Sequence, residues 1–456
     1  MTLWTSEQIA EATGGKATAE FSVTGLSIDT RSLKAGDLFV ALKDSRDGHD
    51  FIPAAVEAGA GGILCEIVPD GASAVLVEES ARGLKDLGAY ACEMRKALRI
   101  GVTGSVGKTS VKDALAVMFD AFGHAHKSLK SFNNHYGVPI TLATIPEEAD
   151  YAVLEMGMNH AGEMSDLSHQ AKPQIAIINN VAGAHLANFE NTEGIADAKA
   201  EIIDGMEPGG TIILNGDNEY TPRIRAKAEA AKLNILTFGH SDDHDVTIVS
   251  QNSHANGGNI RLRIAKQQID VTLMVPGEHW FMNAAACMAV AYAAELPLRK
   301  AAMALRKITA APGRGDFHAL NIDGKSITLI DESYNANPTS MRAAFAVAAL
   351  RPGRKIALLG DMYELGADEL ELHRALADPL VEAGFERVFM SGECMRLLMG
   401  ALPQPMRAGW SSKPQSLLTK LKGELLEGDI VLIKGSNASG VGKVAAQLRE
   451  EGSHAL

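Results

Sequence analysis

The chain has 456 residues, of which 46% are hydrophobic and 22% are charged, a composition typical of a globular protein. This length exceeds one ordinary hydrophobic core, so two to four domains are expected. The formal net charge of −13 argues against a general binder of nucleic-acid backbones, although a local basic pocket for phosphates remains compatible with it.

The first 95 residues alternate short apolar runs with helical stretches. The opening "MTLWTSEQIAEATGG" lacks a signal-peptide pattern and predicts a helix, with Thr5 and Gln8 as a capping box and glycines at its end. Strands are expected at 37–42, 61–66 and 74–79, with a helix at 50–60. Apolar runs of membrane-spanning length are not found, so we expect a cytoplasmic protein.

A second unit begins at Leu98 and a third follows residues 311–317, "APGRGDF". Strands at 151–157, 173–180 and 210–217 alternate with helices and predict a mostly parallel sheet. Residues 243–275 predict antiparallel strands, before a helix at 280–295. The last unit has strands ending in polar loops, as in a Rossmann-like fold. We predict an α/β protein with three domains, 1–96, 97–311 and 312–456.

The four cysteines give no metal-binding or C-x-x-C spacing. We expect them to be buried, small apolar residues in a reducing compartment. They are Cys65, Cys92, Cys287 and Cys394.

The segment "GVTGSVGKTS" places a glycine-rich loop between a strand and a helix. This context is the one that a phosphate-binding loop needs. Backbone N–H groups and the helix N-terminus favour phosphate, the lysine would reach the β- and γ-phosphates, and the threonine would hold Mg²⁺. A Walker loop would have glycine at Val102, so the pattern is a shortened variant; the alternative is a glycine turn before Lys-Thr by chance. The loop residues are Gly104, Ser105, Val106, Gly107, Lys108, Thr109 and Ser110.

Three further residues are candidate metal ligands. Glu155 ends a strand, where an α/β sheet places ligand groups, but a solvated strand end is as compatible with the pattern. His185 follows the next strand, and such a lone histidine is more often structural. Lys199 would be a surface residue of a helix by its spacing, and an ammonium repels Mg²⁺ unless CO₂ converts the amine into a carbamate.

Three other residues are candidate ATP contacts, each with a structural alternative. Asn283 begins an apolar helix, and its amide suits an adenine edge. Arg314 lies on the expected hinge and would bring positive charge to a γ-phosphate when the domains close. Asp331 ends a strand and would accept hydrogen bonds from ribose hydroxyls.

Together these segments resemble the Mur ligase family over nearly the whole chain. The resemblance follows, in order, "SIDTRSLKAGDLFVAL", "DGHDFI", "GVTGSVGKTS", "SFNNHYGVPITL", "LEMGMNHAGEM", "AHLANFENTEGIADAKAEI", "PGRGDF", "DESYNANPTSM", "LLGDMYELG" and "IKGSN". "YNANP" with "LGDMYELG" distinguishes the members that add D-alanyl-D-alanine from their sister ligases and from folylpolyglutamate synthases, which share the loop.

The resemblance implies an ATP-dependent ligase that joins D-alanyl-D-alanine to UDP-N-acetylmuramoyl-tripeptide through an acyl phosphate. It implies a UDP-substrate domain, a central ATPase domain and a C-terminal domain for the dipeptide. It assigns Thr109, Glu155, His185 and a carbamylated Lys199 to Mg²⁺. Lys108, Glu155, His185 and Lys199 would be catalytic, and Asn283, Arg314 and Asp331 would contact ATP. Substrate contacts are implied for Asp29, Thr30, Arg31, Gly48, His49, Asn134 and Asn335.

The chain departs from the family pattern in three places. Asp44 stands where glycine is common, "DES" replaces "DDS" and keeps an acid at position 332, and Asn437 replaces the arginine of "KGSR". The last change leaves open how the C-terminal domain neutralises an anionic ligand. Lys434, Ser436, Asn335 and Asn337 are weak candidates for contacts there.

Other functions remain open. A sister ligase would accept a different amino acid, a P-loop NTPase switch would hydrolyse ATP without either substrate, and a ligase-like binding protein would have lost catalysis. The base for the incoming amine is also open, with His185 and substrate phosphate as candidates. We expect a monomer.

Overall fold

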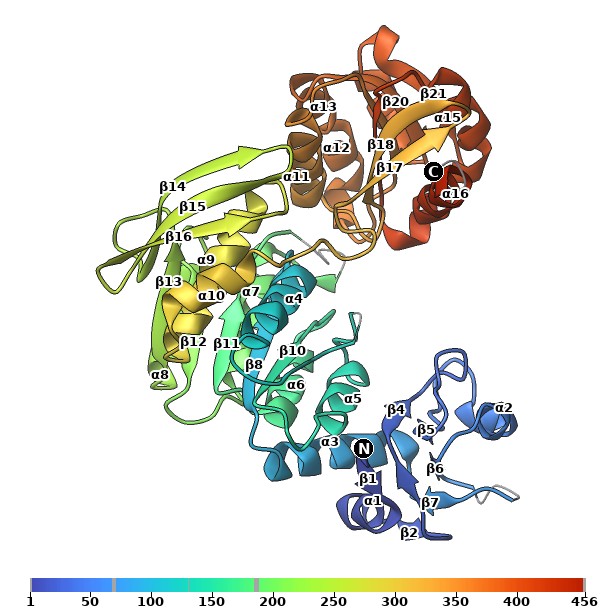
Figure 1. Ribbon diagram of the computed structural model, residues 1–456, viewed down its shortest axis with the longest axis vertical. Coiled ribbons are helices and arrows are strands. Elements are labelled where there is room, and N and C mark those ends of the chain that lie inside the picture. Colours follow the sequence, from blue (N-terminus) through green and yellow to red (C-terminus); the bar gives the residue numbers. More distant parts are fainter. Residues whose placement is uncertain (1, 68–70, 130, 184–187, 454–456) are drawn as a thin grey trace.

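The computed structural model describes residues 2–67, 71–129, 131–183 and 188–453. It has three lobes arranged along the chain, each built around its own sheet (Figure 1). Within the described residues, no helix has the length and apolar character needed to cross a membrane.

The first lobe contains a five-stranded sheet in the order β2-β7-β6-β5-β4, parallel except for β2. The strands and helices of this lobe are β1 (Trp4–Thr5), α1 (Ser6–Thr13), β2 (Lys16–Ala17), β3 (Ser22–Val23), β4 (Gly25–Ser27), β5 (Asp37–Val40), α2 (Ile52–Glu57), β6 (Gly62–Cys65), β7 (Ala74–Leu76) and α3 (Ser80–Met94). The predicted capping box of Thr5 and Gln8 is confirmed, and α1 ends at Gly14 in the left-handed conformation.

The second lobe contains a nine-stranded sheet in the order β16-β15-β14-β13-β12-β11-β8-β10-β9. Its strands are β8 (Leu98–Thr103), β9 (Ala125–Lys127), β10 (Tyr151–Glu155), β11 (Ile175–Ile178), β12 (Thr211–Asn215), β13 (Asn234–Gly239), β14 (Val246–His254), β15 (Gly257–Ile264) and β16 (Gln267–Leu273). The predicted antiparallel region is confirmed, because β14, β15 and β16 pair antiparallel while the other strands run parallel.

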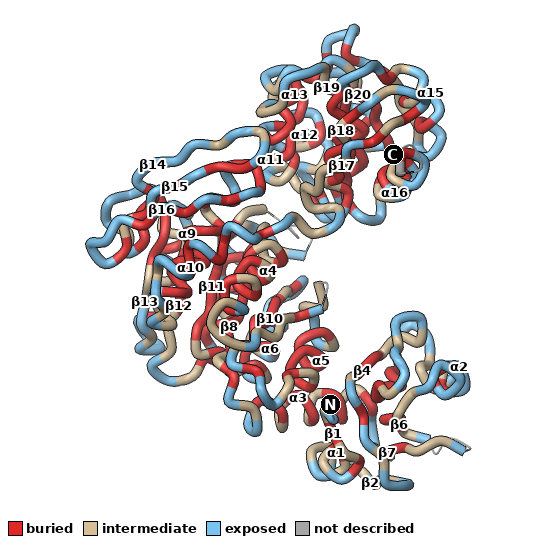
Figure 2. The backbone as a smooth tube through the Cα atoms, in the orientation of Figure 1, coloured by how far each residue is buried: buried red, intermediate tan, exposed pale blue. Residues whose placement is uncertain are grey.

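Helices cover both faces of the parallel part of this central sheet, so its strands are largely buried, whereas β14, β15 and β16 each have exposed residues (Figure 2). The helices are α4 (Lys108–Phe119), α5 (Gly137–Ala143), α6 (Glu163–Ala171), α7 (Thr192–Ala200), α8 (Thr221–Ala230), α9 (His279–Ala293) and α10 (Leu298–Leu305). Val102 lies inside β8 and is fully buried. A buried parallel strand favours valine over glycine, which accounts for the shortened loop.

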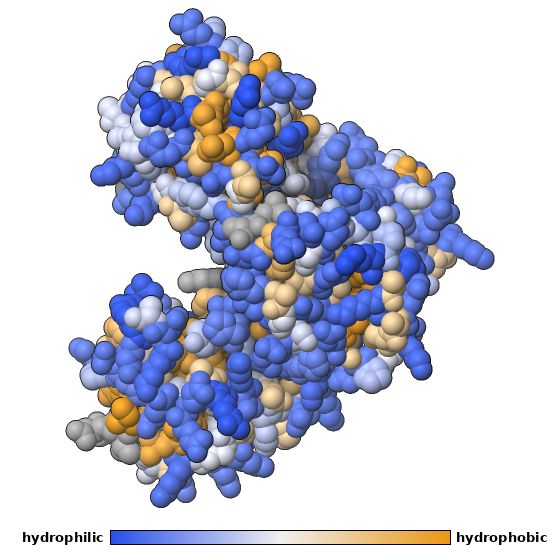
Figure 3. Space-filling model, turned by 180° about the vertical axis from the view of Figure 1, so that it is seen from behind, coloured by the Kyte–Doolittle hydropathy of each residue, from blue (hydrophilic) through white to orange (hydrophobic). Residues whose placement is uncertain are grey.

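The third lobe contains a six-stranded sheet in the order β17-β18-β22-β19-β20-β21, with only the β17–β18 pair antiparallel. Its elements are β17 (Asp316–Ile322), β18 (Lys325–Glu332), α11 (Pro338–Ala349), β19 (Lys355–Gly360), α12 (Glu369–Arg374), α13 (Ala377–Glu382), β20 (Phe385–Ser391), α14 (Met395–Ala401), β21 (Arg407–Ser411), α15 (Leu418–Glu424), β22 (Ile430–Lys434) and α16 (Val441–Ser453). Seen from behind, the surface is hollowed between the first and third lobes (Figure 3).

Candidate functional site

A cavity of about 500 Å³ lies where the phosphate loop of the second lobe meets the third lobe. The carboxyl ends of parallel strands supply much of its lining, as expected for an open α/β sheet. The lining residues used below are Val106, Gly107, Lys108, Thr109, Ser131, Asn133, Glu155, Asn179, Asn283, Arg314, Glu332, Tyr334, Asn335 and Lys434.

The phosphate loop is held by the segment that follows β11, the strand beside β8 in the sheet. Ser105 N–H donates to Asn180 O (3.0 Å), and Val106 N–H donates to Asn180 Oδ1 (3.0 Å). Ser105 Oγ donates to Ala182 O at 2.8 Å. Gly107, with φ of 85°, then starts α4 in a conformation that suits glycine. The loop therefore presents the N-terminus of a helix to the cavity, a ready site for an anion.

Lys108 lies at the centre of this arrangement. Its Nζ donates to Gly104 O at 2.6 Å, so the ammonium rests against its own loop. Burial lowers the pKa of Lys108, whereas the nearby Glu155 carboxylate opposes that shift. A bound phosphate would stabilise the charged form of this buried amine, because the negative charge of the phosphate offsets the positive charge of the ammonium.

Glu155 ends β10 and is 1% exposed. Its Oε1 accepts from Asn133 Nδ2 at 2.9 Å, whereas its buried Oε2 has no hydrogen-bond partner within the part of the chain that the structure describes. Lys112 Nζ is 3.8 Å from Oε2. Thr109 Oγ1 lies 3.3 Å from Ser131 Oγ. Carboxylate and hydroxyl oxygens in a buried cluster, one of them without a hydrogen-bond partner among the described residues, fit a divalent cation such as Mg²⁺.

Lys199 is not a surface residue, contrary to the prediction from its spacing. It is 1% exposed near the end of α7, and burial, together with the charge of Lys108, holds its pKa well below the usual range. The hydrophobic residues around α7 are part of the core beneath the sheet, which the helical period alone did not reveal. His185 lies outside the described residues.

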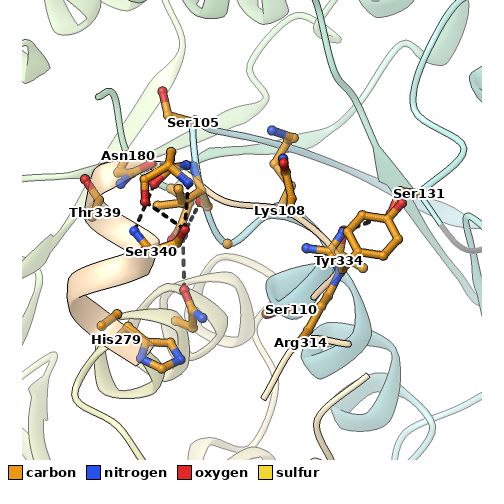
Figure 4. Close-up of a pocket in the computed structure, with 18 of the residues that line it drawn as sticks. Ser105, Lys108, Ser110, Ser131, Asn180, His279, Arg314, Tyr334, Thr339 and Ser340 are labelled. Carbon is orange, nitrogen blue, oxygen red and sulfur yellow. Dashed lines mark hydrogen bonds between the residues drawn. The ribbon is translucent and has the colours of Figure 1, made fainter. Parts of the chain in front are cut away.

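Arg314 comes from the segment between α10 and β17 and reaches back to the second lobe. It donates to Ser131 Oγ at 3.1 Å, and its guanidinium lies 3.9 Å from the centroid of the Tyr334 ring. Figure 4 shows Arg314, Tyr334 and Ser131 together on one side of Lys108, with Thr339, Ser340 and His279 on the other. Arg314 thus lines the same cavity as the phosphate loop, and its role at the γ-phosphate stays a prediction.

Asp331 does not line the cavity. It is 1% exposed, its Oδ1 accepts from Ser333, and its Oδ2 pairs with Arg449 at 3.1 Å. Successive residues of a strand point to opposite faces, so Glu332 takes the cavity-facing position. Glu332 Oε2 pairs there with Lys434 Nζ at 3.2 Å.

Two predicted amide residues have different surroundings. Asn335 lines the cavity, and its backbone oxygen accepts from Lys434 Nζ at 3.0 Å. Asn134 instead accepts from the backbone N–H groups of Tyr136 (3.2 Å) and Gly137 (3.0 Å), at the start of α5. Its neighbour Asn133 is the residue that lines the cavity and that sequence reasoning missed.

The predicted UDP-substrate residues lie in the first lobe, away from this cavity. Arg31 is exposed and pairs bidentately with Asp29 at 2.6–3.1 Å. Gly48 is required sterically, because a Cβ there would lie 2.5 Å from Leu42 O. His49 Nδ1 lies 2.6 Å from Asp47 Oδ1. These contacts order two loops at the edge of the first sheet.

A second group of potential metal ligands occurs in the third lobe, where Asp361, His373 and Cys394 place ligand atoms within 4.8 Å of one another. Both His373 nitrogens are already engaged, Nδ1 against Glu369 O (2.6 Å) and Nε2 as acceptor from Met362 N–H (2.9 Å). Burial also raises the pKa of Cys394 to about 11. The group is therefore satisfied by hydrogen bonds. Cys394 is partly exposed, unlike the three buried cysteines.

Comparison with known proteins gives consistent matches over the chain. Residues 102–291 match the Mur ligase middle domain, and residues 313–437 match the Mur ligase glutamate ligase domain. The UDP-N-acetylmuramoyl-tripeptide–D-alanyl-D-alanine ligase of Rickettsia prowazekii is 30% identical over 97% of this chain and 99% of its own length. The Escherichia coli ligase of the same name is 32% identical over 95% of this chain and 96% of its own length.

Solved structures give the same result. A MurF crystal structure from Acinetobacter baumannii is 29% identical, with a TM-score of 0.85 and coverage of 98% of this chain and 99% of that chain. MurF from Thermotoga maritima, solved in complex with ADP, is 25% identical, with a TM-score of 0.79 and coverage of 95% and 99%.

Proposed function

The chain belongs to the Mur ligase family, and we propose that it joins D-alanyl-D-alanine to UDP-N-acetylmuramoyl-tripeptide, using ATP, in peptidoglycan precursor synthesis. The observation that carries this proposal is the cavity between the second and third lobes. It combines a phosphate loop, the buried Glu155 carboxylate and the hinge residue Arg314. An activity that needs nucleotide and peptide together requires such a shared site.

The reaction must activate a carboxylate, which is a poor electrophile because oxide is a bad leaving group. The tripeptide carboxylate attacks the γ-phosphorus of ATP, a C–O–P link forms, and ADP leaves with the electrons of the broken P–O bond. The dipeptide amine, after losing a proton, attacks the acyl carbon. The C–O bond breaks and inorganic phosphate departs. The sum is one amide, ADP and phosphate.

Groups of this chain would stabilise the negative charge that this reaction brings together. The donor carboxylate and the γ-phosphate are both anions, so bringing them together requires positive charge. Lys108 and the N-terminus of α4 supply it from one side of the cavity, and Arg314 supplies it from the segment between α10 and β17. Lobe closure over the cavity would keep water from the acyl phosphate.

Mg²⁺ is part of the proposal. Thr109 and Glu155 would hold it, and the buried Oε2 of Glu155, which has no hydrogen-bond partner among the described residues, supports this assignment. When bound, the ion would neutralise charge on the transferring phosphoryl group. His185 remains a predicted ligand. The low pKa of Lys199 leaves more of its amine uncharged, the form that reacts with CO₂, which supports carbamylation.

The predicted domains give the remaining assignments. Residues 1–96 would hold the UDP end of the substrate through Asp29, Thr30, Arg31, Gly48 and His49. Residues 97–311 would hold ATP, with Asn283 at the adenine, and residues 312–456 would hold the dipeptide near Asn335. We propose a cytoplasmic monomer, because the substrate is a nucleotide conjugate and one chain contains every predicted site.

The test measures phosphate release from ATP and Mg²⁺ with UDP-N-acetylmuramoyl-tripeptide, with and without D-alanyl-D-alanine, together with the product mass. We expect release that needs both substrates and a product heavier by the dipeptide less water. Turnover with a single amino acid instead would identify a sister ligase. ATP hydrolysis indifferent to both substrates would contradict the proposal and favour an NTPase switch.

A further inference from the structure

Asn179 is a cavity residue whose position is fixed on both sides of its backbone. It follows β11 and is 6% exposed. Its N–H donates to Thr103 O at 2.9 Å, and its carbonyl accepts from Asn215 Nδ2 at 3.1 Å. Residues at the ends of β8 and β12 therefore hold it between them, beside the phosphate loop.

The side chain of Asn179 is held by its donor end alone. Nδ2 donates to Val106 O (3.2 Å) and to Asn283 Oδ1 (3.0 Å). Oδ1 is buried and has no hydrogen-bond partner among the described residues. The reverse orientation of the amide would place Oδ1 against the Val106 carbonyl, two acceptors facing each other. A buried unpaired carbonyl is unfavourable, so the contacts made by the donor end must outweigh it.

This contact fixes the orientation of Asn283. One lone pair of Asn283 Oδ1 is engaged by Asn179, and turning the Asn283 amide over would bring two donors together. Asn283 Nδ2 donates no hydrogen bond to any residue that the structure describes, and Asn283 lines the cavity. Gly107 makes room for the pair, because a Cβ there would lie 2.4 Å from Asn179 Nδ2 and 3.1 Å from Asn283 Oδ1.

We propose that Asn179 is a positioning residue that sets the preference for adenine by orienting the amide of Asn283. In that orientation, Asn283 Nδ2 donates to a ring nitrogen of the base, and the second lone pair of Oδ1 accepts from the exocyclic amino group. Guanine has a carbonyl oxygen where adenine has this amino group, so it would place an acceptor against Oδ1. The inference rests on the proposed function in one respect, that ATP occupies this cavity.

The test is calorimetric binding of ADP and GDP to the full chain, to Asn179→Ala, to Asn283→Ala and to the double variant. For Asn179→Ala we expect the Kd for ADP to rise about tenfold, while the Kd for GDP changes less than about twofold. When Asn283 is already alanine, adding Asn179→Ala should leave the ratio of the Kd for ADP to the Kd for GDP unchanged, because Asn179 acts through Asn283. Asn234→Ala, an exposed residue outside the cavity, is the matched control.

Two results would overturn the proposal. Equal weakening of ADP and GDP would mean that Asn179 only holds the phosphate loop. If the two alanine substitutions have additive effects on the ratio of the Kd for ADP to the Kd for GDP, Asn179 does not act through Asn283. If Asn179→Ala melts early, Asn179→Leu, which keeps side-chain volume but has no donor, gives the same comparison. ADP binding needs neither peptide substrate, so either of these two results leaves the ligase proposal standing. If the unaltered chain does not bind ADP at all, that result counts against the ligase proposal.

Discussion

Replacing Lys108 with methionine tests whether its charge stabilises the transferring phosphoryl group. Methionine keeps most of the length of the side chain and removes the charge. Two unit charges about 4 Å apart interact by about 4 kcal/mol at an effective dielectric constant of about 20, the value that suits such sites. Because about 1.4 kcal/mol corresponds to a factor of ten, kcat/KM should fall by about 10³-fold.

The same substitution should not destabilise the empty protein. Burial lowers the pKa of Lys108, so the charged amine is costly there, and methionine removes that cost. The assay is coupled ADP release with both substrates, alongside a thermal melt. Lys127→Met is the control, because Lys127 is partly exposed and pairs with Asp113 at 2.7 Å, outside the cavity lining. A loss below about tenfold, or a loss explained by a lower Tm, would refute the reasoning.

Further predictions concern three other residues. Lys199→Ala should abolish turnover, with partial rescue by a short carboxylic acid; full activity without rescue would exclude a carbamate. Because the pKa of Lys199 is lowered from 10.5, the unfolding free energy should fall as pH decreases below that value, and Lys199→Ala should reduce this slope in urea titrations at several pH values. Arg314→Lys keeps the charge but loses the stacking on Tyr334, so kcat should fall about tenfold with little change in KM for ATP; unchanged kcat would contradict this. Asp429→Asn removes the bidentate pair with Arg354 and should lower the unfolding free energy by about 2 kcal/mol without changing KM, as measured by denaturant titration; a KM change would argue against a purely structural role.

The sequence predicted those features that depend on local pattern. The capping box at Thr5, the switch to antiparallel strands after β13 and the strand–loop–helix around Lys108 all follow from period, caps and turn residues. The short strands β1 to β4 were not predicted, because two or three residues carry no readable alternation.

The site was predicted only in part, because its assembly depends on long-range packing. The burial of Lys199 is set by how α7 packs on the sheet, which its polar sequence does not reveal. Which of Asp331 and Glu332 faces the cavity depends on the register of β18. Ser131 and Asn179 come from separate loops, so the contact of Ser131 with Arg314 and that of Asn179 with Asn283 became evident only in the folded chain.

The measurement that tests the central claim most directly follows oxygen from the tripeptide carboxylate. The tripeptide is labelled with ¹⁸O in its terminal carboxylate and incubated with ATP, Mg²⁺ and D-alanyl-D-alanine. The account predicts one ¹⁸O in each inorganic phosphate and one retained in the new amide, because the C–O bond of an acyl phosphate breaks on attack by the amine. Phosphate carrying oxygen from water instead would contradict activation through an acyl phosphate.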